Sequence, residues 1–169
     1  METREEILNK VKQYIVNVLE PKRKEFSGFA ACPFVKAERL KDRIMYDVLD
    51  GSKKFIDLVK EFDASNYTTA IFVQLFPDGE SLTPKQGSQY QRFLNASMKE
   101  NGLGKYKNIC FNPSQNYNID GFAARKQAPY FIINVAPRKD LAKAHDSLLN
   151  TDYFSNFPDD YKKFLKLKG

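Results

Sequence analysis

Residues 68–76 read TTAIFVQLF, and this stretch decides the fold that the sequence predicts. Most of its residues are apolar, β-branched or aromatic, which is typical of a strand that is covered on both faces of a sheet. Pro77 and Gly79 follow directly and end the strand. The sequence therefore predicts a sheet in which this strand is central and against which helices pack.

Three other strands are predicted around the central one, at residues 43–49, 106–111 and 130–136. A strand–helix–strand unit usually pairs its strands in parallel through a right-handed crossover. The last two strands are joined by a long loop instead of a helix, so they can pair antiparallel. We therefore expect a mixed four-stranded sheet with helices packed on it, which is an α+β fold.

Helical patterns occupy much of the remaining chain. The clearest begins at Thr3, where Thr3 and Glu6 fit a capping box, and another begins at Thr83 with a proline in its first turn. The element order is α-β-α-β-α-β-β-α-α, and after the first helix it follows a thioredoxin-like order. No repeat or linker divides the chain, so we expect residues 1–169 to form a single domain. The predicted helices lie at residues 3–20, 52–62, 84–100, 139–149 and 158–167.

The net charge of +6 and the pI of about 9.2 favour anionic partners, such as nucleic acid, phosphorylated metabolites or acidic proteins. A solvated lysine-rich surface explains the same charge without any partner. Two cysteines are too few for a disulfide framework, so we interpret Cys32 and Cys110 as reduced thiols. The amino terminus has no apolar signal core, and no apolar run is long enough for a bilayer. These features predict a cytoplasmic protein that makes no membrane contact.

The long loop at residues 112–128 is the segment in which we expect ligand-binding residues, because binding residues concentrate on loops held by a scaffold. Arg125, together with Arg43 from the first strand, can hold a carboxylate or phosphate. Asn112 and Asp120 can then orient the bound group. A surface loop held by Asx-turns is the alternative interpretation.

Two interpretations of Cys32, within the sequence Cys32-Pro33-Phe34, fit its surroundings. Lys36, Arg39 and Arg43 lie close in sequence and could lower a thiol pKa, as a catalytic cysteine requires. The adjacent residues are apolar, however, and cysteine is often a small buried hydrophobe. No second cysteine lies at Cys-x-x-Cys spacing, so dithiol chemistry is not expected.

His145 is the single histidine, and it falls on a predicted helix. One histidine and two isolated cysteines exclude a multi-histidine site and a structural zinc site, so no metal is expected. The sequence contains no P-loop, no Gly-x-Gly-x-x-Gly and no Gly-x-Ser-x-Gly motif. It also contains no helix-turn-helix, zinc-finger or aromatic RNA-binding signature.

A family resemblance rests on the Phe-Ala-Ala-Cys-Pro-Phe stretch at residues 29–34, on Phe-Asn-Pro at 111–113, and on Arg125 followed by Ala-Pro-Tyr at 128–130. These motifs resemble an uncharacterised bacterial family with an early Cys-Pro-Phe motif and a late Phe-His-Pro motif. Asn112 stands where that family has histidine, so any acid–base role there would be lost. A more distant similarity is to YqcI/YcgG-type proteins, some of which are haem-dependent oxygenases. That similarity implies haem as a cofactor, with His145 among the candidate axial ligands.

Three functional hypotheses follow, and the sequence leaves open whether the chain is an enzyme. The first is a small-molecule-binding domain for a small anionic molecule, with Cys32 lining or attacking and Arg43, Asn112, Asp120 and Arg125 binding the ligand. The second is a non-enzymatic basic interaction module for nucleic acid or an acidic protein. The third is a protein that binds haem or another chromophore.

Overall fold

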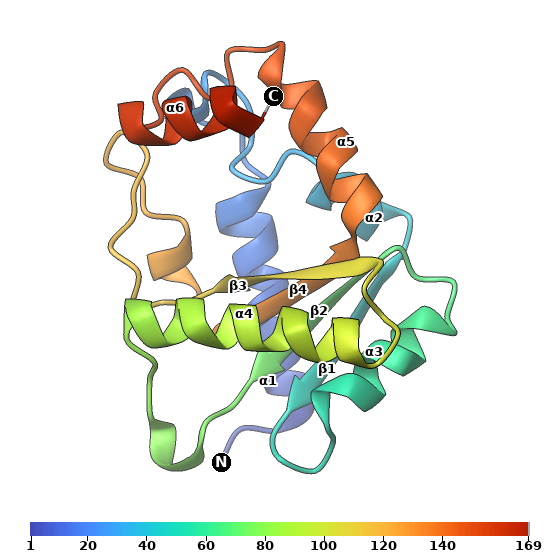
Figure 1. Cartoon of the computed structure of the whole chain (residues 1–169). Helices are drawn as coiled ribbons and strands as arrows, with labels where there is room; N and C mark the ends of the chain where they lie inside the picture. The colour runs from blue at the N-terminus through green and yellow to red at the C-terminus, as the bar shows by residue number, and fades with distance from the viewer. Residues whose placement is uncertain (169) are drawn as a thin grey trace.

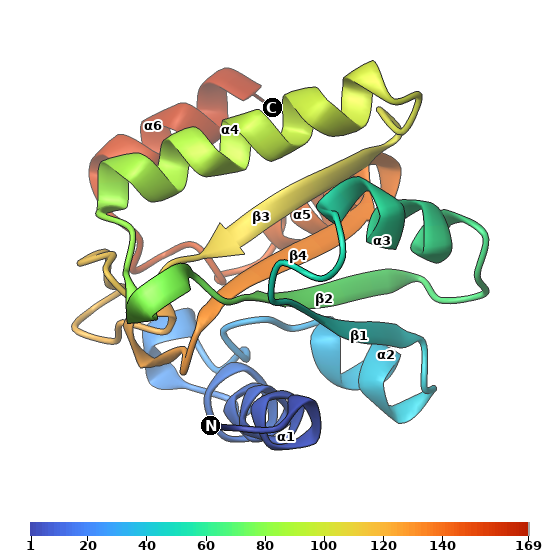
Figure 2. The same ribbon diagram turned by 90° about the horizontal axis from the view of Figure 1, so that it is seen from below.

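The computed structural model describes residues 1–168, with the side chains of position 78 and of positions 164–168 left aside. At its centre is a four-stranded mixed sheet in the order β1-β2-β4-β3 (Figures 1 and 2). β1 pairs in parallel with β2, and β4 pairs antiparallel with both β2 and β3. The α+β fold and the mixed sheet predicted from sequence are therefore confirmed. The strand bounds are Ile44–Leu49 for β1, Thr69–Gln74 for β2, Tyr106–Phe111 for β3 and Phe131–Pro137 for β4.

The helices largely follow the predicted segments. The predicted capping box of Thr3 and Glu6 forms at α1, and Thr83, the predicted cap of α4, forms a second capping box with Gln86. The first helix continues as a π-helical turn, η1 (Ile15–Leu19), and a short helix that the sequence did not predict, α2, precedes β1. The remaining short elements are η2 (Lys24–Phe26), η3 (Pro77–Gly79) and η4 (Arg125–Gln127). The α-helices are α1 (Arg4–Tyr14), α2 (Val35–Leu40), α3 (Phe55–Asp63), α4 (Pro84–Glu100), α5 (Arg138–Leu149) and α6 (Asp159–Lys168).

The helices cover both faces of the sheet (Figure 2). α3 and α4 pack on one face around Phe72, Leu94 and Met98, all fully or almost fully buried. α1 and η1 pack on the other face, where Val11 and Ile15 meet Ile71 of β2. Side chains of β2 alternate between these two cores, and for this reason its sequence is apolar at nearly every position.

A third cluster lies away from the sheet and is mainly aromatic. Phe26 stacks on Tyr153 at 5.3 Å between ring centroids and meets Phe122 edge-to-face at 6.0 Å. This cluster joins the segment after η1 to the β3–β4 loop and to the chain before α6. Figure 1 shows the same β3–β4 loop reaching from the sheet toward α6.

Both outer edges of the sheet are occupied by side chains. At the β3 edge, the backbone amides of Asn108 and Cys110 donate to Asn95 Oδ1 (2.9 Å) and Gln91 Oε1 (2.7 Å) of α4. Asn108 Nδ2 also donates to Asn95 Oδ1 at 2.7 Å. α4 therefore covers this edge with carboxamide groups.

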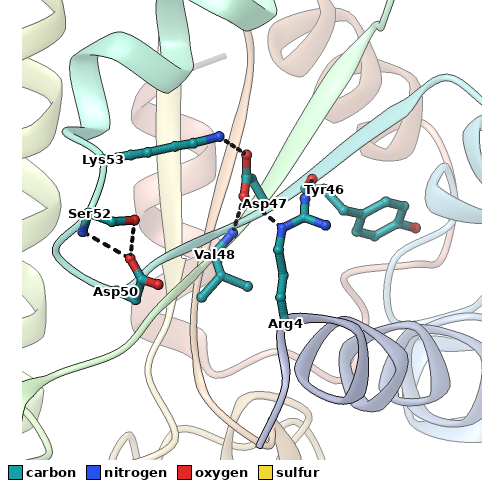
Figure 3. A network of polar contacts seen from close by, with 7 residues as sticks. All are labelled: Arg4, Tyr46, Asp47, Val48, Asp50, Ser52 and Lys53. Atoms are coloured by element: carbon teal, nitrogen blue, oxygen red, sulfur yellow. Dashed lines mark hydrogen bonds and ion pairs between the residues drawn. The ribbon is translucent and has the colours of Figure 1, made fainter.

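At the β1 edge, Asp47 is the centre of a network of polar contacts (Figure 3). Its Oδ1 accepts from the Val48 amide at 2.7 Å and from Arg4 Nε at 3.2 Å, and its Oδ2 accepts from Lys53 Nζ at 3.2 Å. Arg4 Nη2 also donates to the Tyr46 carbonyl at 3.3 Å. The amino terminus of α1 is thereby fixed against the edge strand.

Across residues 1–168, no helix combines the length and the apolar character that crossing a bilayer would require.

Candidate functional site

A cavity of about 590 Å³ lies between the α1-side face of the sheet, α2 and α5. Its floor is formed by side chains of β2 and β4 that point to this face, including Ile71, Ile132 and Ala136. α5 forms one wall through Leu141 and Ala144. The helix approaches the core closely only near its end, where Leu148 is its one buried residue among those described. One face of α5, from Asp140 to Ser147, therefore borders the cavity.

The inner end of the cavity is apolar. Val11, Ile15 and Leu19 from α1 and η1 line it, and Phe111 closes it from the end of β3. Tyr14 also lies here, and its hydroxyl donates to the Ala124 carbonyl at 2.6 Å. Burial raises the pKa of Tyr14, so the hydroxyl stays protonated and keeps this bond. Tyr14 thus ties α1 to the β3–β4 loop behind the cavity.

The outer end of the cavity is polar, because the first residues of β1 and β2 and the last residues of β4 meet there. Asn134 Nδ2 donates to Thr69 Oγ1 at 2.9 Å and to the Ala70 carbonyl at 3.1 Å. Thr69 Oγ1 donates in turn to the Val135 carbonyl at 3.1 Å. Asn134 Oδ1 accepts no hydrogen bond from the described residues, so this acceptor is available to a bound molecule.

Four charged side chains surround this polar end: Glu38, Arg43, Asp140 and Lys143. None of the four forms a salt bridge within the described part of the chain. The Glu38 carboxylate accepts a hydrogen bond from the Thr68 hydroxyl. Asp140 lies in the first turn of α5, where the helix dipole favours a negative charge. Arg43 and Lys143 have no carboxylate partner in the part of the chain that the structure describes.

Cys32 lines the cavity on the side of α2. Burial raises the pKa of its thiol, and the backbone amides of Val35 and Phe34 only partly offset that effect. Cys110 lies in the core on the opposite face, where burial raises its pKa to about 12. Both thiols are free. The environment of Cys32 therefore favours the neutral thiol, which is a poor nucleophile.

Arg43 is the second predicted residue that the structure brings to the cavity, and it lies at the polar end. Arg125 lies outside the lining, at the start of η4. Its Nη1 donates to Gln115 Oε1 at 3.1 Å, and its guanidinium lies 5.2 Å from the Phe111 ring centroid. Because Phe111 also closes the cavity, Arg125 lies just behind the inner end, whereas Arg43 lies at the outer end.

Asn112 is buried on the opposite face of the sheet, where its hydrogen bonds stabilise the fold. Its Nδ2 donates to the carbonyls of Leu82 and Thr83, both at 3.2 Å, and its Oδ1 accepts from the Ser114 amide at 3.0 Å. Asp120 is exposed at a turn and has a positive φ of 51°. The structure therefore does not join Cys32, Arg43, Asn112, Asp120 and Arg125 into one site.

His145 lies on α5 but does not line the cavity. Its ring contacts Phe154 at 5.5 Å between centroids, and its Nδ1 lies 3.8 Å from Asp146 Oδ1. Nothing in its position suits an axial haem ligand inside the cavity. The described residues contain no group of three or more His, Cys, Asp or Glu side chains that could hold a metal ion.

The cavity also contains residues that sequence reasoning did not select, chiefly Tyr14, Glu38, Thr69 and Asn134. Asn134 carried a usable signal, because it is the one carboxamide in an otherwise apolar strand. Tyr14 carried none, since it lies in a helical pattern that needs no ligand to explain it, and Glu38 carried none, since it lies in a segment without a periodic pattern. Comparisons with protein-family models, with curated proteins and with solved structures find no match to this chain.

Proposed function

We propose that this chain is a cytoplasmic small-molecule-binding domain whose ligand has an apolar body and an anionic end. The apolar body occupies the inner part of the cavity, against Val11, Ile15 and Ile132. The anionic end lies at the polar end, beside Arg43 and Lys143. The observation that carries this proposal is a cavity of about 590 Å³ that is apolar inside and polar at one end.

The size and lining of the cavity support this proposal. Small-molecule sites usually measure about 300–1,000 Å³ and combine a mainly apolar lining with a few placed polar groups. The fixed polar groups here are Thr69 and Asn134, whose mutual hydrogen bond holds Asn134 Oδ1 in place. A hydroxyl or amide group next to the ligand's anionic end would donate a hydrogen bond to Asn134 Oδ1.

The sign of the charge follows from which rim groups already have partners. The Glu38 carboxylate accepts a hydrogen bond from the Thr68 hydroxyl, and the helix dipole at the start of α5 stabilises the negative charge of Asp140. Arg43 and Lys143 have no carboxylate partner among the described residues, so they are the groups left to bind a ligand. The net charge of +6 further favours an anion.

The proposal includes neither haem nor a nucleophilic cysteine. Cys32 and Tyr14 line the cavity, but the raised pKa of each disfavours the anionic form that would bind haem iron. The same raised pKa removes the reactivity that covalent catalysis by Cys32 requires. Reversible binding is the function that this arrangement supports best.

The test uses two fluorescent probes, anionic anilinonaphthalene sulfonate and neutral Nile red. Ala144→Phe on the cavity side of α5 should weaken binding of both probes at least about tenfold by filling the site. Ala142→Phe, at an exposed position on the same helix, is the matched control and should bind like the wild type. Equal probe binding by the two variants would contradict the proposal.

The charge preference is tested separately. Arg43→Gln combined with Lys143→Gln should weaken binding of the sulfonate probe by about 3- to 30-fold and leave Nile red binding unchanged. A parallel loss of both probes would indicate a change in the fold of the rim. Unchanged binding of both probes would show that Arg43 and Lys143 do not contribute to recognition of the ligand's charge.

A further inference from the structure

Asn134 is a carboxamide in a mainly apolar part of the cavity floor. Ile132, Asn134 and Ala136 lie two positions apart on β4, so they share one face of the sheet, and all three line the cavity. Across the β2–β4 pair, the residue opposite Asn134 is Ile71, which lines the cavity as well. A carboxamide is costly in apolar surroundings unless its groups are hydrogen-bonded, so both ends of this side chain require partners.

The hydrogen bonds of Asn134 fix the orientation of its carboxamide. Nδ2 donates to the Ala70 carbonyl at 3.1 Å, and a carbonyl can only accept, so the nitrogen must lie on that side. Nδ2 also donates to Thr69 Oγ1 at 2.9 Å, and the hydroxyl of Thr69 donates in turn to the Val135 carbonyl at 3.1 Å. A flipped carboxamide would bring Oδ1 against the Ala70 carbonyl with no hydrogen between the two oxygens. Oδ1 therefore lies on the side away from the Ala70 carbonyl.

Asn134 Oδ1 is an accessible acceptor without a donor. It accepts no hydrogen bond from the described residues, whose one fully buried and unpartnered side-chain atom is Arg23 Nε. Oδ1 is therefore not sealed inside the protein. Because Asn134 lines the cavity, a molecule bound in the cavity can reach this oxygen and donate a hydrogen bond to it.

The acceptor lies next to the segment that carries Arg43. The Thr69 amide donates to the Arg43 carbonyl at 3.4 Å, and the Thr68 amide donates to the same carbonyl at 2.9 Å. Thr69 also accepts the hydrogen bond from Asn134, so it joins the start of β1 to the carboxamide. Arg43 lines the cavity at this same end. A ligand whose anionic group lies beside Arg43 therefore places its adjacent atoms near Asn134 Oδ1.

We propose that the ligand is a 2-hydroxy or 2-amino acid with an apolar chain, so that an O–H or N–H donor lies on the carbon next to its carboxylate. This inference rests on the proposed function and names the class of ligand. The carboxylate lies beside Arg43 and Lys143, the donor bonds to Asn134 Oδ1, and the chain extends over Ile132. Asn134 is a specificity-determining residue, because an acid without this donor leaves Oδ1 desolvated and unpaired.

The experiment measures how well four acids of one chain length displace Nile red from the full-length protein. The acids are decanoate, 2-hydroxydecanoate, 2-aminodecanoate and 2-methoxydecanoate; the methoxy group has the bulk of a substituent but no hydrogen to donate. We expect the hydroxy acid, the amino acid or both to bind about 5- to 50-fold more tightly than decanoate and the methoxy acid. The tighter of the two identifies the donor as O–H or N–H. Equal affinities for all four acids would overturn the inference.

Two variants test whether the preference comes from Asn134. In Asn134→Ala, the decanoate dissociation constant divided by that of the preferred substituted acid should fall to about one. Asn66→Ala, which removes a carboxamide at an exposed position after α3, should keep the wild-type ratio. Each ratio compares two ligands on one variant, so a general loss of affinity cancels. An unchanged ratio in Asn134→Ala would overturn the role of this residue, and if that variant does not fold, the four acids on the wild type still decide the ligand class.

This inference and the proposed function can fail separately. If decanoate displaces Nile red but the substituted acids bind no more tightly, the cavity binds apolar acids and only the donor is wrong. If no acid displaces Nile red although Ala144→Phe still weakens binding of that probe, the ligand class is wrong and the cavity remains a binding site. If Ala144→Phe and Ala142→Phe bind the fluorescent probes equally, the proposed function fails, and this inference fails with it.

Discussion

Glu20 and Arg39 form a two-point ion pair, with Arg39 Nε 2.5 Å from Glu20 Oε2 and Arg39 Nη2 2.7 Å from Glu20 Oε1. Glu20 is 6% exposed at its side chain and follows η1, and Arg39 is 30% exposed on α2. None of the α2 side chains is fully buried, and Val35 packs against the core as a partly buried residue. The ion pair, together with the hydrogen bond from the Thr68 hydroxyl to the Glu38 carboxylate, holds this wall of the cavity in place.

Glu20→Gln should loosen α2. One partner of a shielded pair is lost and Arg39 is left without its counter-charge, so we expect a fall of about 1–2 kcal/mol in the free energy of unfolding. Amide hydrogen exchange across residues 35–40 should accelerate more than exchange in β2. Lys36→Met, at an exposed position on α2, is the control. Unchanged exchange in α2 of Glu20→Gln would show that other contacts hold the helix.

Asp47 should make stability depend on pH in the acid range. Burial alone would raise the pKa of Asp47, but the Val48 amide, Lys53 and Arg4 together bring it below the ordinary 3.8. A depressed folded-state pKa contributes stability that is present above 3.8 and is lost as pH falls through the folded value.

Urea unfolding at a series of pH values tests this expectation. The stability difference between wild type and Asp47→Asn should be constant above about pH 5 and should shrink progressively below pH 4. Glu61→Gln, on the exposed face of α3, should show a much smaller pH-dependent difference. A gap between wild type and Asp47→Asn that persists to pH 2 would exclude a lowered pKa at Asp47.

Cys32 should alkylate slowly at neutral pH, and faster as the pH rises past 9.0, the ordinary thiol value. Iodoacetamide followed by mass spectrometry should modify Cys32 alone in the native protein and Cys110 only in denaturant. Anilinonaphthalene sulfonate should protect Cys32, since both occupy the cavity. Rapid modification of Cys32 at pH 7 would instead identify an activated nucleophile.

Gly87 and Asn112 should be strongly coupled, because a Cβ at Gly87 would lie 2.4 Å from Asn112 Nδ2. Alanine normally stabilises a helix by about 1 kcal/mol relative to glycine. Here the clash should reverse the sign, and Gly87→Ala should cost about 1–3 kcal/mol. In an Asn112→Ala background the same substitution should be neutral or stabilising. Equal effects in the two backgrounds, measured by urea unfolding, would rule out the coupling.

The sheet could be predicted from sequence because its signals are local. Residues 68–76 and 130–136 are apolar on both faces, and the loop between the last two strands left antiparallel pairing open. α2 was missed for the opposite reason: its six residues contain no buried stripe, and its Arg39 pairs with Glu20, nineteen positions earlier. A helix fixed by a distant ion pair leaves no periodic pattern in its own sequence.

The site was less predictable, because its residues converge only in three dimensions. Cys32 and Arg43 do line one cavity, yet two of its walls come from α1 and α5, which read as ordinary amphipathic helices. Asn112 and Arg125 belong to the same loop, but their side chains lie in different parts of the molecule. Asn112 fastens the loop to α4, whereas Arg125 lies behind the cavity. Sequence spacing could not separate these two roles.

The side chains along the outer edges of β1 and β3 also affect whether copies of this chain can associate through their strands. A bare outer strand can pair with a strand of another chain, which is the first step toward fibrillar assembly. Here Arg4 occupies the Tyr46 carbonyl, and Asn95 and Gln91 occupy amides of β3. A neighbouring chain would have to displace these groups before it could add a strand, so the protein should stay dispersed even when it is crowded.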